Sequence, residues 1–388
     1  RLATDCRSRR KTATAMDKSF KVASASELGI GVEDLCRFFD AHWKRRLALG
    51  IPDFYRWQFM AAPENKGLDK CCVAVEEDGS LLGIMGLNER PFLINGKKRK
   101  GAELTTWVVA PQARGRGVGK AIMAYLQDAY EVLLGMGITQ AALPIYLGSG
   151  FEYMRHIPRF VRVYDMDAIA PHARIDREAK DFIEKHAAPE PATYKARAVD
   201  AGALMEPAKA LEAGFNCFLR DSTHLSWRYR DHPIFDYESF VVEGAGKGAG
   251  VVIRRDTVDG MEIAHVIDCF GDLADMPAAM DFIDGYCRER GIHVVDFYCT
   301  SPKIGAAFRR RGWFAVPEDE SFSFVHLFHP PEMRDPPTTS LVYWARDDMG
   351  ELKNTDRLYV TKQDLDLDRP TAATYEKLGK GSATAGRA

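Results

Sequence analysis

Apolar and polar positions change their period several times in the first third of the chain, and each change marks an expected element. From Asp34 to Leu49 the apolar side chains recur every three or four residues, which is typical of a helix with one buried face. A second, shorter helix is expected over 53–60. The pattern then changes to short apolar runs, and Asp78-Gly79 marks a hairpin turn between two of them. The strands expected in this half are 20–23, 72–76, 81–87, 92–94, 104–109 and 132–136.

The stretch from Glu103 to Leu126 predicts a strand, a glycine-rich turn and a helix in succession. Pro111 ends the strand, because proline cannot donate to a ladder, and the apolar residues after Gly119 recur at helical spacing. Such a turn directs bare backbone N–H groups at the positive end of a helix dipole. It is therefore expected to bind a phosphate or pyrophosphate group. Its positive charges come from Arg114, Arg116 and Lys120.

Three phosphate-binding patterns compete for this turn, beside the interpretation that it is only a glycine-rich surface loop. A Walker loop needs Ser or Thr after Lys120, where this chain has Ala121. A dinucleotide fingerprint needs Gly-x-Gly-x-x-Gly, whereas these glycines stand at alternate positions. The third pattern, Arg-x-x-Gly-x-Gly, is matched by Arg114, Gly117 and Gly119. That pattern is the coenzyme A pyrophosphate signature of the GNAT superfamily of acetyl-CoA-dependent N-acyltransferases, which this stretch resembles.

A second match follows the turn. Enzymes of this superfamily continue with a strand and then a helix reading Asn-x-x-Ala-x-x-Leu-Tyr-x-x-x-Gly-Phe. This chain places Tyr146 four residues before Gly150-Phe151 and has Thr139 where the pattern has asparagine. Pro144 departs from the pattern, so the helix is expected to be short or bent. The resemblance extends over residues 20–165.

A third match is Glu103, which lies eleven positions before Arg114. The catalytic glutamate of histone-acetylating members has the same offset, so the resemblance implies that Glu103 is the general base for the incoming ammonium. It also implies that Tyr146 gives a proton to the departing thiolate. The alternatives are that Glu103 is a carboxylate at a strand end and that Tyr146 is an aromatic residue of the core.

The resemblance implies acetyl-CoA as the acyl donor and no metal. In such enzymes the sheet splays open beside the glycine turn, and the thioester arm of the cofactor fills the gap. The residues expected to bind coenzyme A are Val108, Val109, Arg114, Gly115, Arg116, Gly117, Val118, Gly119, Lys120 and Thr139.

The second half of the chain repeats the first, which predicts a tandem arrangement. Trp57-x-Phe59-x-x-x-Pro63 recurs as Trp227-x-Tyr229-x-x-x-Pro233, and Tyr146-x-x-x-Gly150-Phe151 recurs as Phe308-x-x-x-Gly312-Trp313. The second copy lacks Arg-x-x-Gly-x-Gly, and the acids Asp272 and Asp275 after its strand would repel a pyrophosphate. The glycine run 244–250 opens no helix and is expected to be a hairpin loop.

These features predict an α+β protein of two GNAT-like folds, each a mostly antiparallel splayed sheet flanked by helices. The expected divisions are a disordered extension 1–18, an acyltransferase domain 19–165 with the coenzyme A site, a linker 166–194, a degenerate domain 195–330, and an extension 331–388 that is disordered at its end.

Composition narrows the function by exclusion. The net charge of −2 provides no global field for nucleic acid or an anionic membrane, and no apolar run approaches the ~18 residues of a membrane span. The eight cysteines form no Cys-x-x-Cys pair, so we expect reduced thiols in a cytoplasmic protein.

The expected partner is a small-molecule amine, and a homodimer is compatible with the sequence. Similarity to tandem GNAT proteins of surface-polysaccharide biosynthesis suggests an amino sugar. The alternative is a catalytically silent acyl-CoA-binding or scaffold protein.

Overall fold

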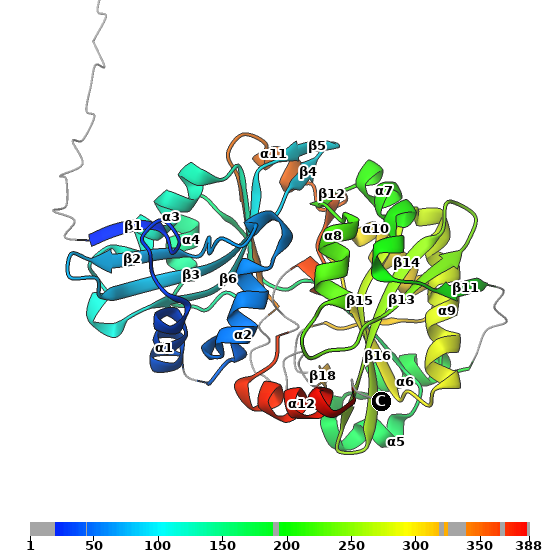
Figure 1. Ribbon diagram of the computed structural model, residues 1–388. Helices are drawn as coiled ribbons and strands as arrows, with labels where there is room; N and C mark the ends of the chain where they lie inside the picture. Colours follow the sequence, from blue (N-terminus) through cyan, green and yellow to red (C-terminus); the bar gives the residue numbers. More distant parts are fainter. Residues whose placement is uncertain are drawn as a thin grey trace, which may run out of the picture.

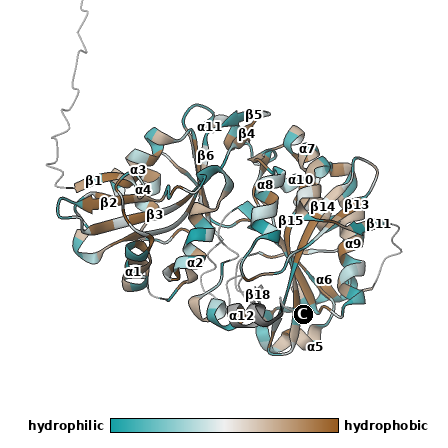
Figure 2. Cartoon of the chain, in the orientation of Figure 1, coloured by the Kyte–Doolittle hydropathy of each residue, from teal (hydrophilic) through white to brown (hydrophobic). Residues whose placement is uncertain are grey.

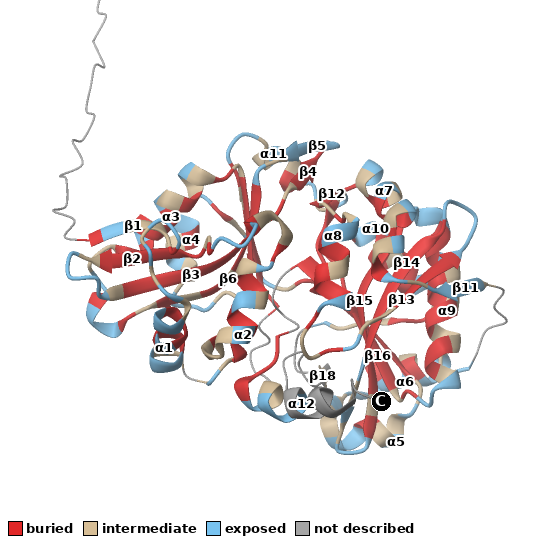
Figure 3. Cartoon of the chain, viewed as in Figure 1, coloured by how far each residue is buried: buried red, intermediate tan, exposed pale blue. Residues whose placement is uncertain are grey.

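The computed structural model describes residues 20–43, 45–188, 194–317, 322–324, 339–364 and 369–385. Two lobes lie side by side, each built around a sheet with helices against it (Figure 1). Apolar residues concentrate on the strands of both lobes (Figure 2), and the strands are also where most residues are buried (Figure 3). The expected α+β class is confirmed.

The first lobe contains a seven-stranded sheet of order β1-β2-β3-β6-β7-β19-β8. Only β6 and β7 run parallel to each other; the other neighbours are antiparallel. The elements of this lobe are β1 (Phe20–Ser24), α1 (Val32–His42), η1 (Ala48–Gly50), α2 (Pro52–Tyr55), η2 (Arg56–Met60), η3 (Pro63–Asn65), β2 (Cys72–Glu76), β3 (Leu81–Glu89), β6 (Gly101–Val109), η4 (Pro111–Ala113), α3 (Val118–Ala129), β7 (Val132–Met136), α4 (Leu143–Gly148), β8 (Glu152–Met154) and β19 (Leu341–Ala345).

The second lobe contains a matching sheet of order β11-β13-β14-β15-β16-β9-β17, in which only β15 and β16 are parallel neighbours. Its elements are β9 (Arg159–Val163), α5 (Met166–Ile169), η5 (Ala170–His172), α6 (Arg177–Lys185), β11 (Lys195–Ala198), η6 (Ala201–Ala203), α7 (Met205–Gly214), α8 (Ser222–Leu225), η7 (Ser226–Arg230), β13 (Glu238–Glu243), β14 (Ala249–Val258), β15 (Met261–Gly271), η8 (Leu273–Asp275), α9 (Met276–Glu289), β16 (Val294–Tyr298), α10 (Pro302–Arg310) and β17 (Phe314–Ala315).

Two small sheets connect segments that are distant in the sequence. A four-stranded sheet has the order β20-β12-β4-β5, and β10 pairs with β18. Their strands are β4 (Phe92–Ile94), β5 (Lys97–Arg99), β12 (Asn216–Phe218), β20 (Leu358–Tyr359), β10 (Ala173–Ile175) and β18 (Phe322–Phe324); the remaining elements are α11 (Met349–Leu352), η9 (Lys362–Asp364) and α12 (Ala372–Ala385).

The two large sheets exchange one strand each. Strand β9 follows β8 in the chain, but it lies in the second sheet between β16 and β17. Strand β19 comes after the second sheet in the chain, but it lies in the first sheet between β7 and β8. The boundaries expected at 165 and 330 therefore cut across the sheets. Each strand takes its place by long-range pairing, which no local pattern in the sequence reveals.

The repeat seen in the sequence is also a repeat of local structure. Each Trp-containing motif forms a π-helical turn, η2 in the first half and η7 in the second, directly after a four-residue α-helix. The two motifs meet, because the rings of Trp57 and Trp227 stack with centroids 5.1 Å apart. The indole N–H of Trp227 donates to the Trp57 carbonyl at 3.1 Å. The two halves thus contact each other through equivalent residues.

Three expectations about element boundaries differ from the structure. The helix expected to reach Leu49 ends at His42, because the chain there turns to pair with the C-terminal segment: the Ala48 N–H donates to the Pro370 carbonyl at 3.3 Å. The expected linker contains α6 and a strand, and α6 buries Ile183 against the second sheet. The expected disorder at the end of the chain is replaced over 372–385 by α12. Residues 1–18 lie outside the described ranges.

Candidate acyl-CoA site

The glycine turn between β6 and α3 has the conformation that its sequence requires. Gly115 and Gly117 adopt φ values of 80° and 82°, in the left-handed region that glycine enters without strain. Gly119 is needed for a different reason: a Cβ there would come within 3.0 Å of both Trp107 and Ile145. The three glycines therefore shape the turn and let α3 pack closely on β6 and α4.

The N-terminus of α3 is open to a ligand. Gly117 is its N-cap, and no side chain among the described residues caps it, so its first N–H groups remain available. Arg114 and Lys120 are exposed beside it. Arg116 donates to Glu76 at 2.6 Å, so part of its charge is already neutralised. The arrangement suits an anion with at least two charges, because the helix dipole and two further cations act on it together.

The sheet splays open next to this turn. Strands β6 and β7 pair only from Gly101↔Val132 to Leu104↔Gly135, although β6 continues to Val109. On its other edge the end of β6 is held by β3, since the Ala110 N–H donates to the Leu82 carbonyl. In an antiparallel pair the residues alternate in direction, so the main chain of Val109 points away from β3 and toward the gap. Val108 instead faces β3 with its main chain and is buried in the core.

The gap has unsatisfied polar atoms along it. The Trp107 indole N–H and the Thr105 hydroxyl, both on the open stretch of β6, are buried without a hydrogen-bond partner among the described residues. Buried polar groups are almost always paired, so such atoms fit a site that a polar ligand completes. Thr139, expected at this site, is exposed, and its carbonyl and hydroxyl accept from the Ala142 N–H at the start of α4.

The sequence model of the acetyltransferase (GNAT) family matches residues 34–142, which include the splayed strands and the glycine turn. Over residues 34–142 the chain is therefore similar to that family. The peptidyl-lysine N-acetyltransferase YiaC of Escherichia coli strain K12 is 35% identical over 79 residues, which are 20% of this chain and 47% of that protein. The chain thus matches about half the length of this curated relative.

Solved structures support the fold over a longer part of the chain. The GCN5-related N-acetyltransferase from Anabaena variabilis aligns with a TM-score of 0.52 and 14% identity, covering 84% of this chain and 72% of that one. The GCN5-related N-acetyltransferase from Kribbella flavida aligns with a TM-score of 0.52 and 17% identity, covering 84% and 71%. At these identities the likeness concerns the fold alone.

Glu103 lies on the paired part of β6, beside the point where the first sheet opens. It is 4% exposed, and its Oε1 accepts from Arg90 Nη1 at 2.6 Å. Burial raises the pKa of Glu103 to about 7, although the Arg90 guanidinium acts in the opposite direction. No described residue donates to its Oε2. A carboxyl group that titrates near neutrality is well matched to accepting a proton from an ammonium.

Tyr146 lies on α4, the short helix expected from Pro144, which occupies its first turn. Its ring is 2% exposed and makes edge contacts with Trp107 and Phe151, at centroid distances of 5.3 and 5.1 Å. Burial raises the pKa of Tyr146, so its hydroxyl stays protonated at neutral pH. No described residue hydrogen-bonds to that hydroxyl, which leaves it available as a donor.

The second half retains the splay, but the chain itself fills it. Strands β15 and β16 pair only from Ile263↔Val294 to Val266↔Phe297, while β15 continues to Gly271. The Tyr359 hydroxyl, from a segment near the C-terminus, lies 2.7 Å from both the Cys269 carbonyl and Asp268 Oδ1 on the open part of β15. Beyond the end of β16, the main chain at Cys299 forms an isolated antiparallel β-bridge with Thr361.

The second half also carries its own anion at the turn. Asp275, at the start of α9, is buried, and its carboxylate accepts from the N–H groups of Gly246 and Gly248 at 2.6 and 3.0 Å. The glycine run 244–250 is therefore a hairpin loop between β13 and β14, as expected, and it binds a side chain of this protein. Together with the filled gap, this leaves the second half without a coenzyme site of the first kind.

No sequence pattern indicates the buried ionic network that surrounds Glu103. Arg90 also donates to Asp364 at 3.2 Å, and Asp364 accepts from Arg220, which in turn pairs with Asp268 at 2.8 Å. The four partners come from both halves, and Arg90 and Asp364 are 274 positions apart, a separation that no motif spacing covers. Within the described ranges, no group of His, Cys, Asp and Glu could hold a metal, and no helix is long and apolar enough to cross a membrane.

Proposed function

We propose that this chain is an acetyl-CoA-dependent N-acetyltransferase that acts on a primary amine of a small molecule. The observation that carries the proposal is the open edge of β6, which leads from the uncapped turn at α3 past Val109 to the paired stretch of β6 on which Glu103 lies. One end suits a pyrophosphate and the other suits an amine. An amino sugar, the acceptor suggested by similarity to polysaccharide-associated proteins, remains a prediction.

The residues of the first half would divide the chemistry as follows. Bound acetyl-CoA supplies the acyl group as a thioester. The N–H groups at the turn, with Arg114 and Lys120, hold the pyrophosphate. The Val109 N–H, which points into the gap, donates to the oxyanion that develops on the attacked carbonyl. Glu103 accepts the ammonium proton, directly or through a water, and the Tyr146 hydroxyl gives a proton to the leaving thiolate.

The catalytically silent alternative is favoured by one observation, and only for the second half. There the gap holds Tyr359 and the turn holds the Asp275 carboxylate, so this half has no space for the same ligand. The first half differs in both respects. The proposed division is therefore one catalytic half and one structural half in the same chain.

The test is calorimetry of the intact chain with acetyl-CoA, followed by a free-thiol release assay over a panel of amines. We expect binding of acetyl-CoA and amine-dependent release of coenzyme A. Binding without thiol release with any amine would support the silent alternative. A lack of binding would refute the site itself.

A further inference from the structure

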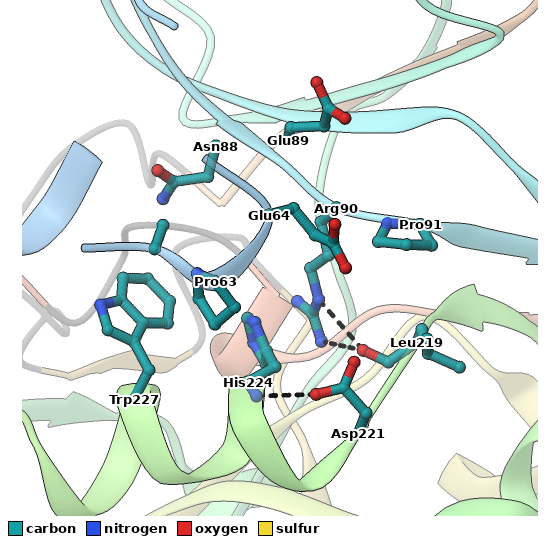
Figure 4. A pocket seen from close by; sticks show the side chains of 11 residues that line it. Pro63, Glu64, Asn88, Glu89, Arg90, Pro91, Leu219, Asp221, His224 and Trp227 are labelled. Atoms are coloured by element: carbon teal, nitrogen blue, oxygen red, sulfur yellow. Dashed lines mark hydrogen bonds between the residues drawn. The ribbon is translucent and has the colours of Figure 1, made fainter. Parts of the chain in front are cut away.

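A small pocket lies between the two halves, beside the network that holds Glu103 (Figure 4). It is partly open to solvent. Segments from both halves form it: the start of η3 and the end of β3 from the first, and α8 with the turn before it from the second. The polar side chains that line it are Glu64, Asn88, Glu89, Arg90, Asp221 and His224.

The pocket carries negative charge that the described residues do not compensate. Glu89 is paired with Lys70 at 2.8 Å. Glu64 and Asp221 form no ion pair with any described residue, and Asp221 uses one oxygen to cap α8 by accepting from the His224 main-chain N–H. Arg90 does not neutralise them, because its guanidinium is already bound to Glu103, Gln363, Asp364 and the Leu219 carbonyl. Two carboxylates on one small pocket favour a cationic ligand.

A second feature of the pocket is a hydrogen-bond donor that has no partner among the described residues. Gln363 Oε1 accepts from Arg90, which directs the amide N–H of Gln363 at His224 Nε2, 2.7 Å away. His224 Nε2 must therefore accept, and the ring proton lies on Nδ1. Burial and the nearby arginines hold the pKa of His224 well below its usual range, so the ring is neutral. The side chain is 7% exposed, lines the pocket, and finds no described partner for its Nδ1–H.

The pocket is close to Glu103 but separated from it by one side chain. Arg90 lines the pocket and contacts Glu103 at 2.6 Å, and Asn88 is the cross-strand neighbour of Glu103. A group held in the pocket therefore cannot give its own proton to Glu103. The group in the pocket can instead be a second group of the acceptor molecule whose reacting amine gives its proton to Glu103.

We propose that this pocket binds a second, non-reacting amino-alcohol group of the acceptor. Its ammonium lies between Glu64 and Asp221, and its hydroxyl oxygen accepts from His224 Nδ1–H. This inference rests on the proposed function and adds the class of acceptor: a hydroxyl-bearing compound with at least two amines. Neither a simple monoamine nor a neutral polyol satisfies both features of the pocket.

The experiment uses three small probes of the same skeleton: 1,3-diamino-2-propanol, 1,3-diaminopropane and glycerol. Each is titrated into the intact chain saturated with coenzyme A, and binding is followed by ligand-observed NMR, so no turnover is needed. We expect the diamino alcohol to bind about ten-fold more tightly than the diamine, because the diamine lacks the acceptor for His224, and glycerol to bind most weakly. The variants Glu64→Gln and Asp221→Asn should each weaken binding of the diamino alcohol about ten-fold. Asparagine at position 221 keeps the oxygen that caps α8.

Glu178→Gln is the matched control, since Glu178 is exposed on α6 in the second lobe and should change nothing. His224→Phe should abolish the difference between the diamino alcohol and the diamine. The proposal is overturned if the wild-type chain does not prefer the diamino alcohol, or if both carboxylate variants bind it like the wild type. Acetyl-CoA is titrated separately into the intact chain without coenzyme A. If acetyl-CoA binds but the chain shows no preference among the probes, this pocket alone is refuted, whereas failure of acetyl-CoA to bind refutes the proposed function.

Discussion

Replacing Tyr146 by phenylalanine tests the chemistry of the site most directly, because the structure contains its own precedent. Phe308 occupies the equivalent place in the second half. In both places the main-chain carbonyl of the aromatic residue accepts from the N–H five positions later. The Phe151 N–H donates to Tyr146 at 3.1 Å and the Trp313 N–H donates to Phe308 at 3.2 Å, and a glycine with positive φ precedes each donor. A phenyl ring therefore fits this helix end without rearrangement. Tyr146→Phe removes only the hydroxyl.

The expected effects on stability and on rate are very different in size. The Tyr146 hydroxyl binds no described residue, so its removal forfeits none of the ~0.5–1.5 kcal/mol that a hydrogen bond contributes to folding, and the ring contacts with Trp107 and Phe151 remain. Loss of a general acid should lower turnover by about 10²-fold, which is ~2.7 kcal/mol of the activation barrier. The assays are thiol release at saturating acetyl-CoA, calorimetry for acetyl-CoA affinity, and thermal melting.

Tyr229→Phe provides the control. The Tyr229 hydroxyl is also buried without a described partner, and the first half has Phe59 at the equivalent position. This variant should match the wild type in rate, affinity and melting temperature. If Tyr146→Phe also turns over at the wild-type rate, Tyr146 is a packing residue, and water or the substrate ammonium supplies the proton.

Three further predictions concern the cofactor and the base. Gly117→Val places a branched side chain at a φ of 82° where phosphate is expected, so acetyl-CoA binding should weaken by more than ~2 kcal/mol by calorimetry; unchanged affinity in a folded variant would contradict the site. The stoichiometry should be one acetyl-CoA per chain, and two would contradict the filled gap of the second half. Because the pKa of Glu103 is raised to about 7 and the carboxylate is the active form, kcat/KM should rise with pH through about 7. Glu103→Gln should remove this rise, and its persistence would assign the titration to another group.

The parts of the site that the sequence could predict are those built from consecutive residues. The strand, the glycine turn and α3 follow from proline, glycine and helical spacing, because each is decided by the local backbone. The repeat of the Trp motif was also visible, and the structure adds that Trp57 and Trp227 stack on each other. Local signals thus located the candidate coenzyme site and the equivalence of the halves.

What the sequence could not predict depends on segments that meet only in the folded chain. The partners of Glu103, namely Arg90 and through it Asp364, come from a connection after β3 and from a helical turn near the C-terminus. The segment that follows the helix end at His42 is likewise held by main-chain bonds of Ala48 to Pro370 and of Ala372 to Arg46. Tertiary pairing overrides propensity in each case, and a single sequence carries no record of it.

The exchange of β19 has a consequence for how the chain is made. In the first sheet β19 (residues 341–345) lies between β7 and β8, so this sheet stays incomplete during synthesis until residue 345 has left the ribosome. At ~5–20 residues per second, the wait from Met154 to Leu341 is on the order of ten seconds or more. During that time the facing edges of β7 and β8 in the first sheet are unpaired and can recruit a foreign strand. Strand β19 therefore closes the first sheet late, and this sheet is completed only after the strands of the second sheet have been translated.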